Sequence, residues 1–274
     1  MRGGLLLTAS LASCGLAAFV ATAAIARVSE PQARTRTHTP AQERPAAERN
    51  VPFAVGETLE YDVGWSSYLT AGTATLSVRA KKPSYNSVAY YVVAEGQATG
   101  LVAALYPAYY KADTLLDVYT LLPQRGSIYS QEGRHQRLRE TRFDQSKGTA
   151  RFEVTPGGHQ KSVTLPGPTH DALSAVLAMR MLSLKDGLSV TWPVCDSGRV
   201  MNVRATVRGR ERLSTRLGDL MAWRIQPVIV GDNGELGARG MTLWLSDDER
   251  KLPLSMEAEM PVGKVVLTLR SAGR

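Results

Sequence analysis

The chain has 274 residues, and 33 Lys and Arg against 25 Asp and Glu give it a formal net charge of +8. A hydrophobic share of 43% and a charged share of 21% are typical of a globular protein and exclude a disordered or fibrous one. The two cysteines, Cys14 and Cys195, exclude a disulfide framework. Beyond the N-terminus no apolar run reaches the roughly 18 residues of a membrane span, which excludes a polytopic membrane protein.

The N-terminus has the layout of an export signal. Arg2 gives it a positive start, and the segment from Leu5 to Ala26 is uncharged and mostly apolar. This pattern predicts a secretory signal peptide over residues 1–26. An uncleaved N-terminal anchor is an alternative, because about 20 apolar residues can span a bilayer. In a third alternative, the segment that ends at Cys14 resembles a bacterial lipoprotein box, and Cys14 is the lipidated residue. All three place the body outside the cytoplasm, in the periplasm or otherwise exported, with membrane association only through the N-terminus.

Residues 27–50 are rich in Arg, Pro, Gln, Thr, Glu and Ala, with Val28 as the only large apolar residue. Such a segment buries too little apolar surface to offset its ordering entropy, so it is expected to be a disordered linker. The remaining residues, 51–274, are expected to form a single β-rich domain. This domain has 27 Lys and Arg against 22 Asp and Glu, so it carries +5 of the net charge.

The body alternates between apolar and polar residues in many short segments. Leu59, Tyr61, Val63 and Trp65, for example, are separated by polar residues or glycine. A period of two predicts strands with one face in solvent. Turn residues between successive segments favour hairpins over crossover connections. The other segments that suit strands are 73–80, 88–95, 138–144, 149–154, 200–207, 223–230, 241–245, 254–259 and 264–269.

One segment has helical spacing. Leu173, Val176, Leu177 and Leu184 recur at intervals of three and four, which predicts a principal helix over residues 169–186. Thr169 is the expected N-cap, with Asp171 in the first turn and Gly187 just beyond the end. A shorter helix is expected from Gly100 to Tyr106, where Pro107 stops it.

The predicted fold is mainly β, a β-rich α+β protein. A large antiparallel sheet, curled into a half-barrel, packs against the helix at 169–186, because that helix is apolar over more than half its circumference and needs cover. Two separate sandwiches joined by the helix are the alternative.

No pattern of residues points to a catalytic or metal site. His170 next to Asp171 could begin an acid–base pair, but it also suits the polar first turn of a helix. Cys195 has no basic neighbour in the sequence that would activate it, so a buried structural thiol is expected. No metal is expected because no pair of ligands has the required spacing, and the acidic run at residues 247–249 lacks the features of a calcium loop. No cofactor is expected.

Basic residues follow two of the predicted strands. His135, Arg137 and Arg139 share one strand face, and a second group shares another: Arg204, Arg208, Arg210 and Arg212. We interpret both as solvent-facing strand surfaces, since acidic residues interleave with them. Export argues against a nucleic-acid partner. Contact with anionic lipid headgroups or an anionic envelope glycan is the functional alternative.

Several segments together resemble the domain-of-unknown-function 3108 family of exported bacterial proteins over about residues 52–270. They are the segments 55–61, 72–74, 169–174 and 243–247, the last of which is followed by Leu252-Pro253-Leu254. The segment from Trp244 to Leu254 is also similar, more distantly, to a strand–turn–strand of the lipoprotein localisation factors. The second resemblance implies an open sheet that folds over a helix and holds an acyl chain. The first supplies no catalytic residues.

Three functions are compatible with these observations. The preferred one is a non-catalytic protein of the bacterial cell envelope that binds a lipid, an acyl chain or another amphipathic ligand in a half-barrel. Its candidate pocket residues are Tyr61, Trp65, Leu76, Trp244 and Met256. The first alternative is a structural or assembly partner of another envelope protein. The second is an envelope hydrolase that uses His170.

Overall fold

The computed structural model describes residues 47–65, 69–230, 240–260 and 263–273. These residues form fourteen strands and two helices, one helix after the third strand and the other after the eighth. The first eight strands are β1 (Thr58–Trp65), β2 (Leu69–Ser84), β3 (Ser87–Ala98), β4 (Ala108–Asp117), β5 (Pro123–Glu132), β6 (His135–Asp144), β7 (Thr149–Thr155) and β8 (His159–Thr164). The remaining six are β9 (Ser189–Asp196), β10 (Arg199–Thr215), β11 (Gly218–Val230), β12 (Met241–Ser246), β13 (Pro253–Met260) and β14 (Gly263–Gly273). The helices are α1 (Gly100–Leu105) and α2 (Ala172–Arg180).

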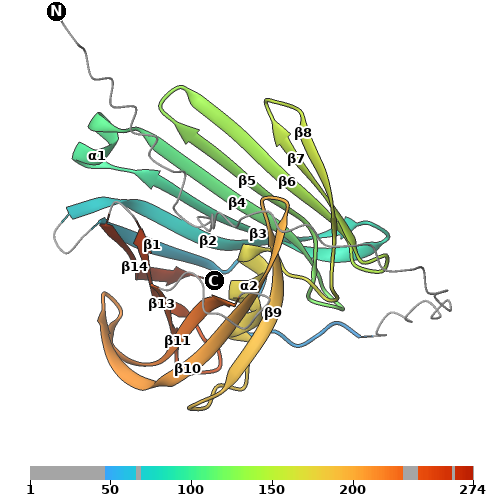
Figure 1. The fold of residues 1–274 in the computed structure, drawn as a ribbon. Helices are drawn as coiled ribbons and strands as arrows, with labels where there is room; N and C mark the ends of the chain where they lie inside the picture. Colours follow the sequence, from blue (N-terminus) through green and yellow to red (C-terminus); the bar gives the residue numbers. More distant parts are fainter. Residues whose placement is uncertain (1–46, 66–68, 231–239, 261–262, 274) are drawn as a thin grey trace, which may run out of the picture.

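All fourteen strands belong to one antiparallel sheet. Its order is β8-β7-β6-β5-β4-β3-β2-β1-β14-β13-β12-β11-β10-β9, so β8 and β9 are its edges. The first and last strands, β1 and β14, pair near the middle and join the two halves of the chain. Figure 1 shows the sheet curling around α2. The predicted fold, an open antiparallel half-barrel on one principal helix, is therefore confirmed, and the alternative of two separate sandwiches is wrong.

The predicted strand segments all lie within observed strands, because their alternation of apolar and polar residues reports a sheet with one buried face. Four strands were not predicted: β4, β5, β8 and β9. Strand β8 is polar at nearly every position and exposed along most of its length, so it has no alternation to recognise.

The helix α2 is shorter than the predicted 169–186 and begins at Ala172, after an N-cap at Asp171 rather than Thr169. Asp171 Oδ1 accepts a hydrogen bond of 2.6 Å from the Ser174 amide, and Ser174 Oγ accepts one of 2.9 Å from the Asp171 amide. This reciprocal capping box fixes the start of the helix. His170 is extended instead, since its amide donates to the Pro193 carbonyl and its carbonyl accepts from the Cys195 amide. The helix ends at Arg180, well before Gly187.

The largest core cluster lies between α2 and the central strands. Leu173 and Leu177 of α2 pack against buried residues of the sheet such as Leu59 and Val92. The buried hydroxyl of Tyr61 donates a hydrogen bond of 2.9 Å to the Pro253 carbonyl. These contacts fix α2 against the inner face of the curled sheet.

A smaller core cluster brings the two edges of the sheet together without strand pairing. Phe143 and Ala150 of β6 and β7 share it with Cys195 of β9, and Val163 of β8 packs against it. The turn after β9 is held close to β7, since a Cβ on Gly198 would lie 2.8 Å from the Phe152 ring. The edge strands β8 and β9 do not pair, but side-chain packing narrows the gap between the two edges of the sheet.

The N-terminal predictions fall largely outside the described residues. Residues 1–46, which include Cys14, are not described. Arg49, which the sequence analysis assigns to the linker, contacts the body: its amide donates to the Val118 carbonyl at 3.1 Å and its Nε to the Tyr119 carbonyl at 3.0 Å. Among the described residues, no helix is long and apolar enough to cross a membrane.

Candidate ligand pocket

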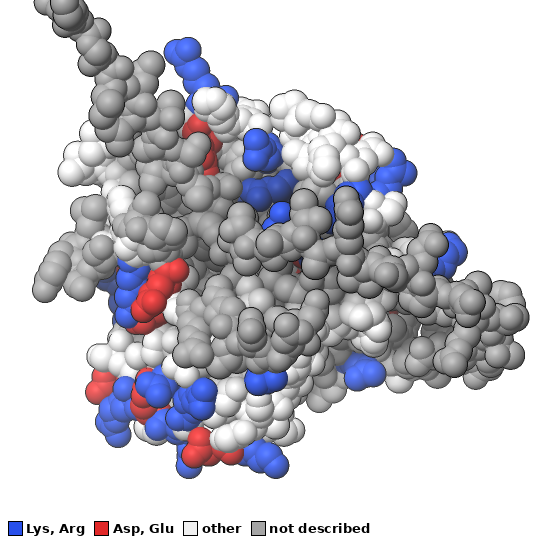
Figure 2. Space-filling model, in the orientation of Figure 1, with Lys and Arg blue, Asp and Glu red and all other residues white. Residues whose placement is uncertain are grey.

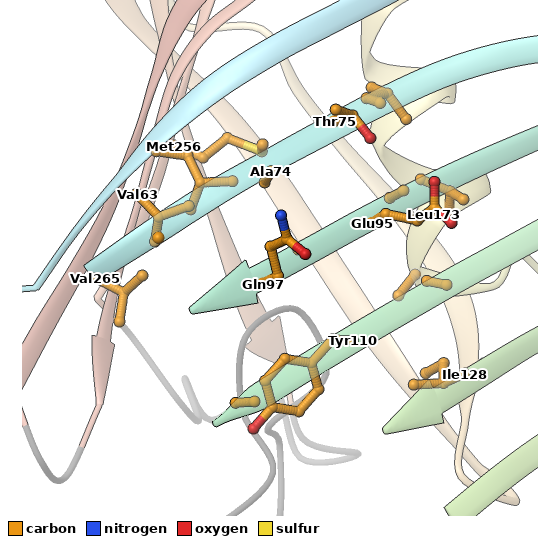
Figure 3. A pocket seen from close by; sticks show the side chains of 18 of the residues that line it. Val63, Ala74, Thr75, Glu95, Gln97, Tyr110, Ile128, Leu173, Met256 and Val265 are labelled. Atoms are coloured by element: carbon orange, nitrogen blue, oxygen red, sulfur yellow. The ribbon is translucent and has the colours of Figure 1, made fainter. Parts of the chain in front are cut away.

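A pocket of about 380 Å³ lies between α2 and the inner face of the sheet. Ala172, Leu173 and Val176 of α2 contribute to its lining, as do strands β1 to β7, β13 and β14, helix α1, and the end of β9 with the turn after it. Figure 3 shows lining side chains of β1 to β5, β13 and β14 directed at the space from several sides. A volume of this size falls in the range of small-molecule sites, roughly 300–1,000 Å³.

The pocket exists because several inward-facing residues of β2, β3 and β4 are small. Ala74 pairs with Gly96 and Gly72 with Ala98, and Ala94 pairs with Ala112 on the next strand. Positions facing a core normally carry large apolar side chains that fill it at close-packed density. Alanine and glycine at these positions leave the space below α2 unfilled.

Four of the five candidate pocket residues line this pocket: Tyr61, Trp65, Leu76 and Met256. Trp244 is not among the lining residues. It is buried in the main core cluster, and its Nε1 donates a hydrogen bond of 2.5 Å to Glu211 Oε1.

Sequence reasoning missed two kinds of lining residue. The first is the set of small inward-facing residues. The sequence pattern that could have revealed them is an alanine or glycine at every second position, as at Gly72 and Ala74 and at Ala94, Gly96 and Ala98. The second is Arg139, which we assigned to a solvent-facing surface but which lines the pocket. It pairs across the sheet with Ile128, whose own partner is Ala112, so all three project to the inner face.

Asp171 lies at the end of the pocket nearest β5. Its side chain is buried, and burial raises the pKa of its carboxyl, although hydrogen bonds from Ser174 act in the opposite direction. The hydroxyl of the nearby Thr114 donates to the Arg125 carbonyl at 3.4 Å. Oδ1 accepts the cap hydrogen bond, whereas Oδ2 has no hydrogen-bond partner among the described residues. The carboxyl is packed against Gly126, where a Cβ would lie 2.5 Å from Oδ2.

Two further polar groups lie at this end. Burial raises the pKa of the Asp196 carboxyl, and the positive charge of Arg139 partly offsets that effect. Burial also raises the pKa of the Cys195 thiol, to about 12, so Cys195 is a protonated structural thiol rather than a nucleophile.

His170 is buried beside the cap of α2 and is not among the lining residues. Its Nδ1 lies 3.2 Å from Ser174 Oγ, and its ring packs edge-on against Trp192. Burial lowers the pKa of His170 to about 4. Asp171 is occupied with capping the helix, so the structure does not bring the two together as a catalytic pair.

The acidic run at residues 247–249 is used in hydrogen bonds. Asp247 accepts from the Trp223 indole at 2.6 Å and from Arg210 at 2.9 Å, and Asp248 accepts from the Lys251 amide. In the described part of the chain, no group of three or more His, Cys, Asp or Glu could hold a metal ion.

Basic and acidic side chains intermingle on the surface. Figure 2 shows them side by side over the lower part of the molecule, where β10 and β11 lie in Figure 1. Arg210 pairs with Asp247, and Arg224 lies 3.8 Å from Glu211. On this face, the described basic residues are mixed with acidic ones and do not form the continuous basic surface that a polyanion would need.

A family model described as "Protein of unknown function (DUF3108)" matches residues 60–270. The chain belongs to this family. The resemblance expected from the sequence is thereby confirmed, and the DUF3108 fold can be compared with solved structures. No curated protein matches the chain significantly.

The DUF3108 chain is similar in fold to a β-barrel-like protein of the DUF1849 family from Brucella abortus. The TM-score is 0.50 at 10% identity, over 80% of this chain and 97% of that one. A Bacteroides fragilis protein with a YmcC-like fold matches with a TM-score of 0.31 at 11% identity, over 83% of this chain and 100% of the other. The first likeness supports a half-barrel fold and carries no information on activity.

Proposed function

We propose that this DUF3108 protein binds the acyl chain of a lipid or of a lipidated protein in the pocket under α2, and that it does so without catalysis. The observation that carries the proposal is the pocket itself, about 380 Å³ and bordered mostly by small and apolar side chains. Apolar, preformed cavities are how proteins hold such ligands. Each methylene that leaves water for the pocket would contribute ~0.8 kcal/mol.

The hollow interior favours ligand binding over a role in assembly alone. A protein that only presented its edges to a partner would gain stability from a filled core, since unfilled volume forfeits packing interactions. Here Ala94, Gly96 and Ala112 leave room on the inner face below Leu173 and Val176.

The place of action that we propose is outside the cytoplasm, in the bacterial envelope. The support is the N-terminal pattern of a positive start and an apolar segment. Acyl chains of envelope lipids and lipoproteins are available there.

The test is to extract the natively purified protein with organic solvent and identify bound lipids by mass spectrometry. The matched control is Ala112→Leu, which fills the pocket from β4. We expect acyl lipids near one per protein in the wild type and far fewer in the variant. Equal lipid in both preparations, or none in either together with no binding of added fatty acids, would contradict the proposal.

A further inference from the structure

The two ends of the pocket differ in chemistry. Val63, Met256 and Val265 form an apolar end, and Figure 3 shows them close together on one side of the space. At the other end, near β5 to β7, the lining includes Arg139, Asp171, Asp196 and Ser197. A purely apolar ligand would make no polar contact at this end.

Arg139 interrupts a row of paired residues, with the apolar Ile128 on one side of it and the apolar Val154 on the other. Through successive pairings the row runs from Leu76 over Ala94, Ala112 and Ile128 to Arg139. The neighbouring Arg125 and Arg142 both pair with Glu140. Arg139 Nε is buried and, like Arg125 Nε, has no hydrogen-bond partner in the part of the chain that the structure describes. A guanidinium whose buried Nε–H has no partner suits an anionic oxygen group.

Asp171 adds a second unused polar atom at the same end. Its side chain is more than nine-tenths buried, and Oδ2 has no partner among the described residues. A buried polar atom without a partner costs about 1–3 kcal/mol, which a ligand group can recover. Because burial favours the neutral carboxylic acid, this oxygen can carry a proton and donate it to an anion.

We propose that the pocket takes an amphiphile with one acyl chain and an anionic oxygen head, with the head at Arg139 and Asp171 and the chain running over Ala112 and Ala94 toward Met256. This inference rests on the proposed function, since it assigns an orientation and a head group to the same ligand. Asp196 lies close enough to Arg139 to feel its charge and would compete with the anion for it. The shared chemistry fits the carboxylate of a fatty acid and the phosphate of a lipid headgroup.

The test compares three probes with the same chain: lauric acid, dodecyl phosphate and lauryl alcohol. Isothermal titration gives their affinities for the wild type, Arg139→Gln and Arg137→Gln. Arg137 lies two residues away on the same strand, is exposed and does not line the pocket. We expect Arg139→Gln to weaken the anionic probes roughly tenfold or more, the size of a lost hydrogen bond to a charged group, and to leave the alcohol unchanged. Arg137→Gln should change none of the three.

A second variant separates a binding role from a structural one. Asp196→Asn removes the competing acid, so it should strengthen binding of the anionic probes and leave the alcohol unchanged. A preference for lauric acid or for dodecyl phosphate identifies the head group.

The orientation is overturned if Arg139→Gln binds lauric acid and dodecyl phosphate as the wild type does, or if it loses the alcohol equally. If the wild type binds none of the three probes, the proposed function fails as well. If it binds all three equally and Arg139→Gln changes nothing, only the head-group assignment fails.

Discussion

Arg180 and Glu57 form a buried ion pair with two contacts, Nη1 to Oε1 at 2.6 Å and Nη2 to Oε2 at 3.1 Å. Arg180 is the last residue of α2 and is fully buried, whereas Glu57 directly precedes β1. Nη2 also donates to the carbonyls of Pro52 and Arg250. The pair therefore fixes the C-terminal end of α2, the helix that covers the pocket, whereas Asp171 caps its N-terminal end.

Glu57→Gln should lower the free energy of unfolding by about 3 kcal/mol or more, because it leaves the Arg180 charge buried without its counter-ion. Urea denaturation at neutral pH measures the change. Glu257→Gln is the control: Glu257 pairs with Lys264 at the surface, and its loss should cost at most about 1 kcal/mol. Similar losses in the two variants would mean that the buried pair does not anchor α2.

Gly126→Ala should destabilise the protein by about 1–3 kcal/mol through overpacking. The new Cβ would lie 2.5 Å from Asp171 Oδ2, so the capping carboxyl would have to move. Gly167→Ala is the matched control, since a Cβ there meets nothing within 4 Å. Thermal unfolding gives the melting temperatures of the two variants. A melting temperature of Gly126→Ala at or above that of Gly167→Ala would show that the contact with Asp171 is not tight.

His170 should make stability depend on pH between about 4 and about 6.5. Its pKa is about 4 in the folded protein and ~6.5 in the unfolded chain, so the unfolded state binds more protons in this window. Stability is therefore full above about pH 6.5 and is lost as the pH falls, by up to about 3 kcal/mol. Urea denaturation measures the free energy of unfolding at pH 7 and at pH 5. The difference between the two values should be smaller in His170→Gln than in the wild type. A folded-state pKa near 6.5 in an NMR titration would refute this.

Cys195 should resist alkylation in the native protein. Burial holds its thiol pKa at about 12, and the thiolate is the reactive form. Iodoacetamide at pH 8 followed by peptide mapping should find Cys195 unmodified in native protein and modified in denaturant. Mapping also separates this site from Cys14, which lies outside the described residues. Rapid native modification of Cys195 would mean that the β9 edge opens readily.

The strands and the single sheet could be predicted because alternation reports a half-buried strand directly. The pocket could be predicted only in part: four of the five candidate residues line it, but alternation does not show how far along a strand the curl of the sheet encloses its inner face. Arg139 and Arg137 share a face, yet only Arg139 lies far enough inside the curl to line the cavity. The start of α2 was missed because Thr169 and Asp171 are both good N-caps, and the choice depends on the distant strand β9 that holds His170 extended.

The central claim is that the space under α2 is a binding site. The direct measurement is a titration of lauric acid into the wild type and into Ala112→Leu, monitored by tryptophan fluorescence. Among the described residues, Trp65 is the one tryptophan that lines the pocket, so Trp65→Phe is the control that assigns the fluorescence change to it. We expect saturable binding by the wild type and at least tenfold weaker binding by Ala112→Leu. The unfolding temperature of that variant should equal or exceed the wild-type value, since the leucine fills empty space. Equal affinities, or a variant destabilised by about 1–3 kcal/mol as in an already filled core, would contradict the central claim.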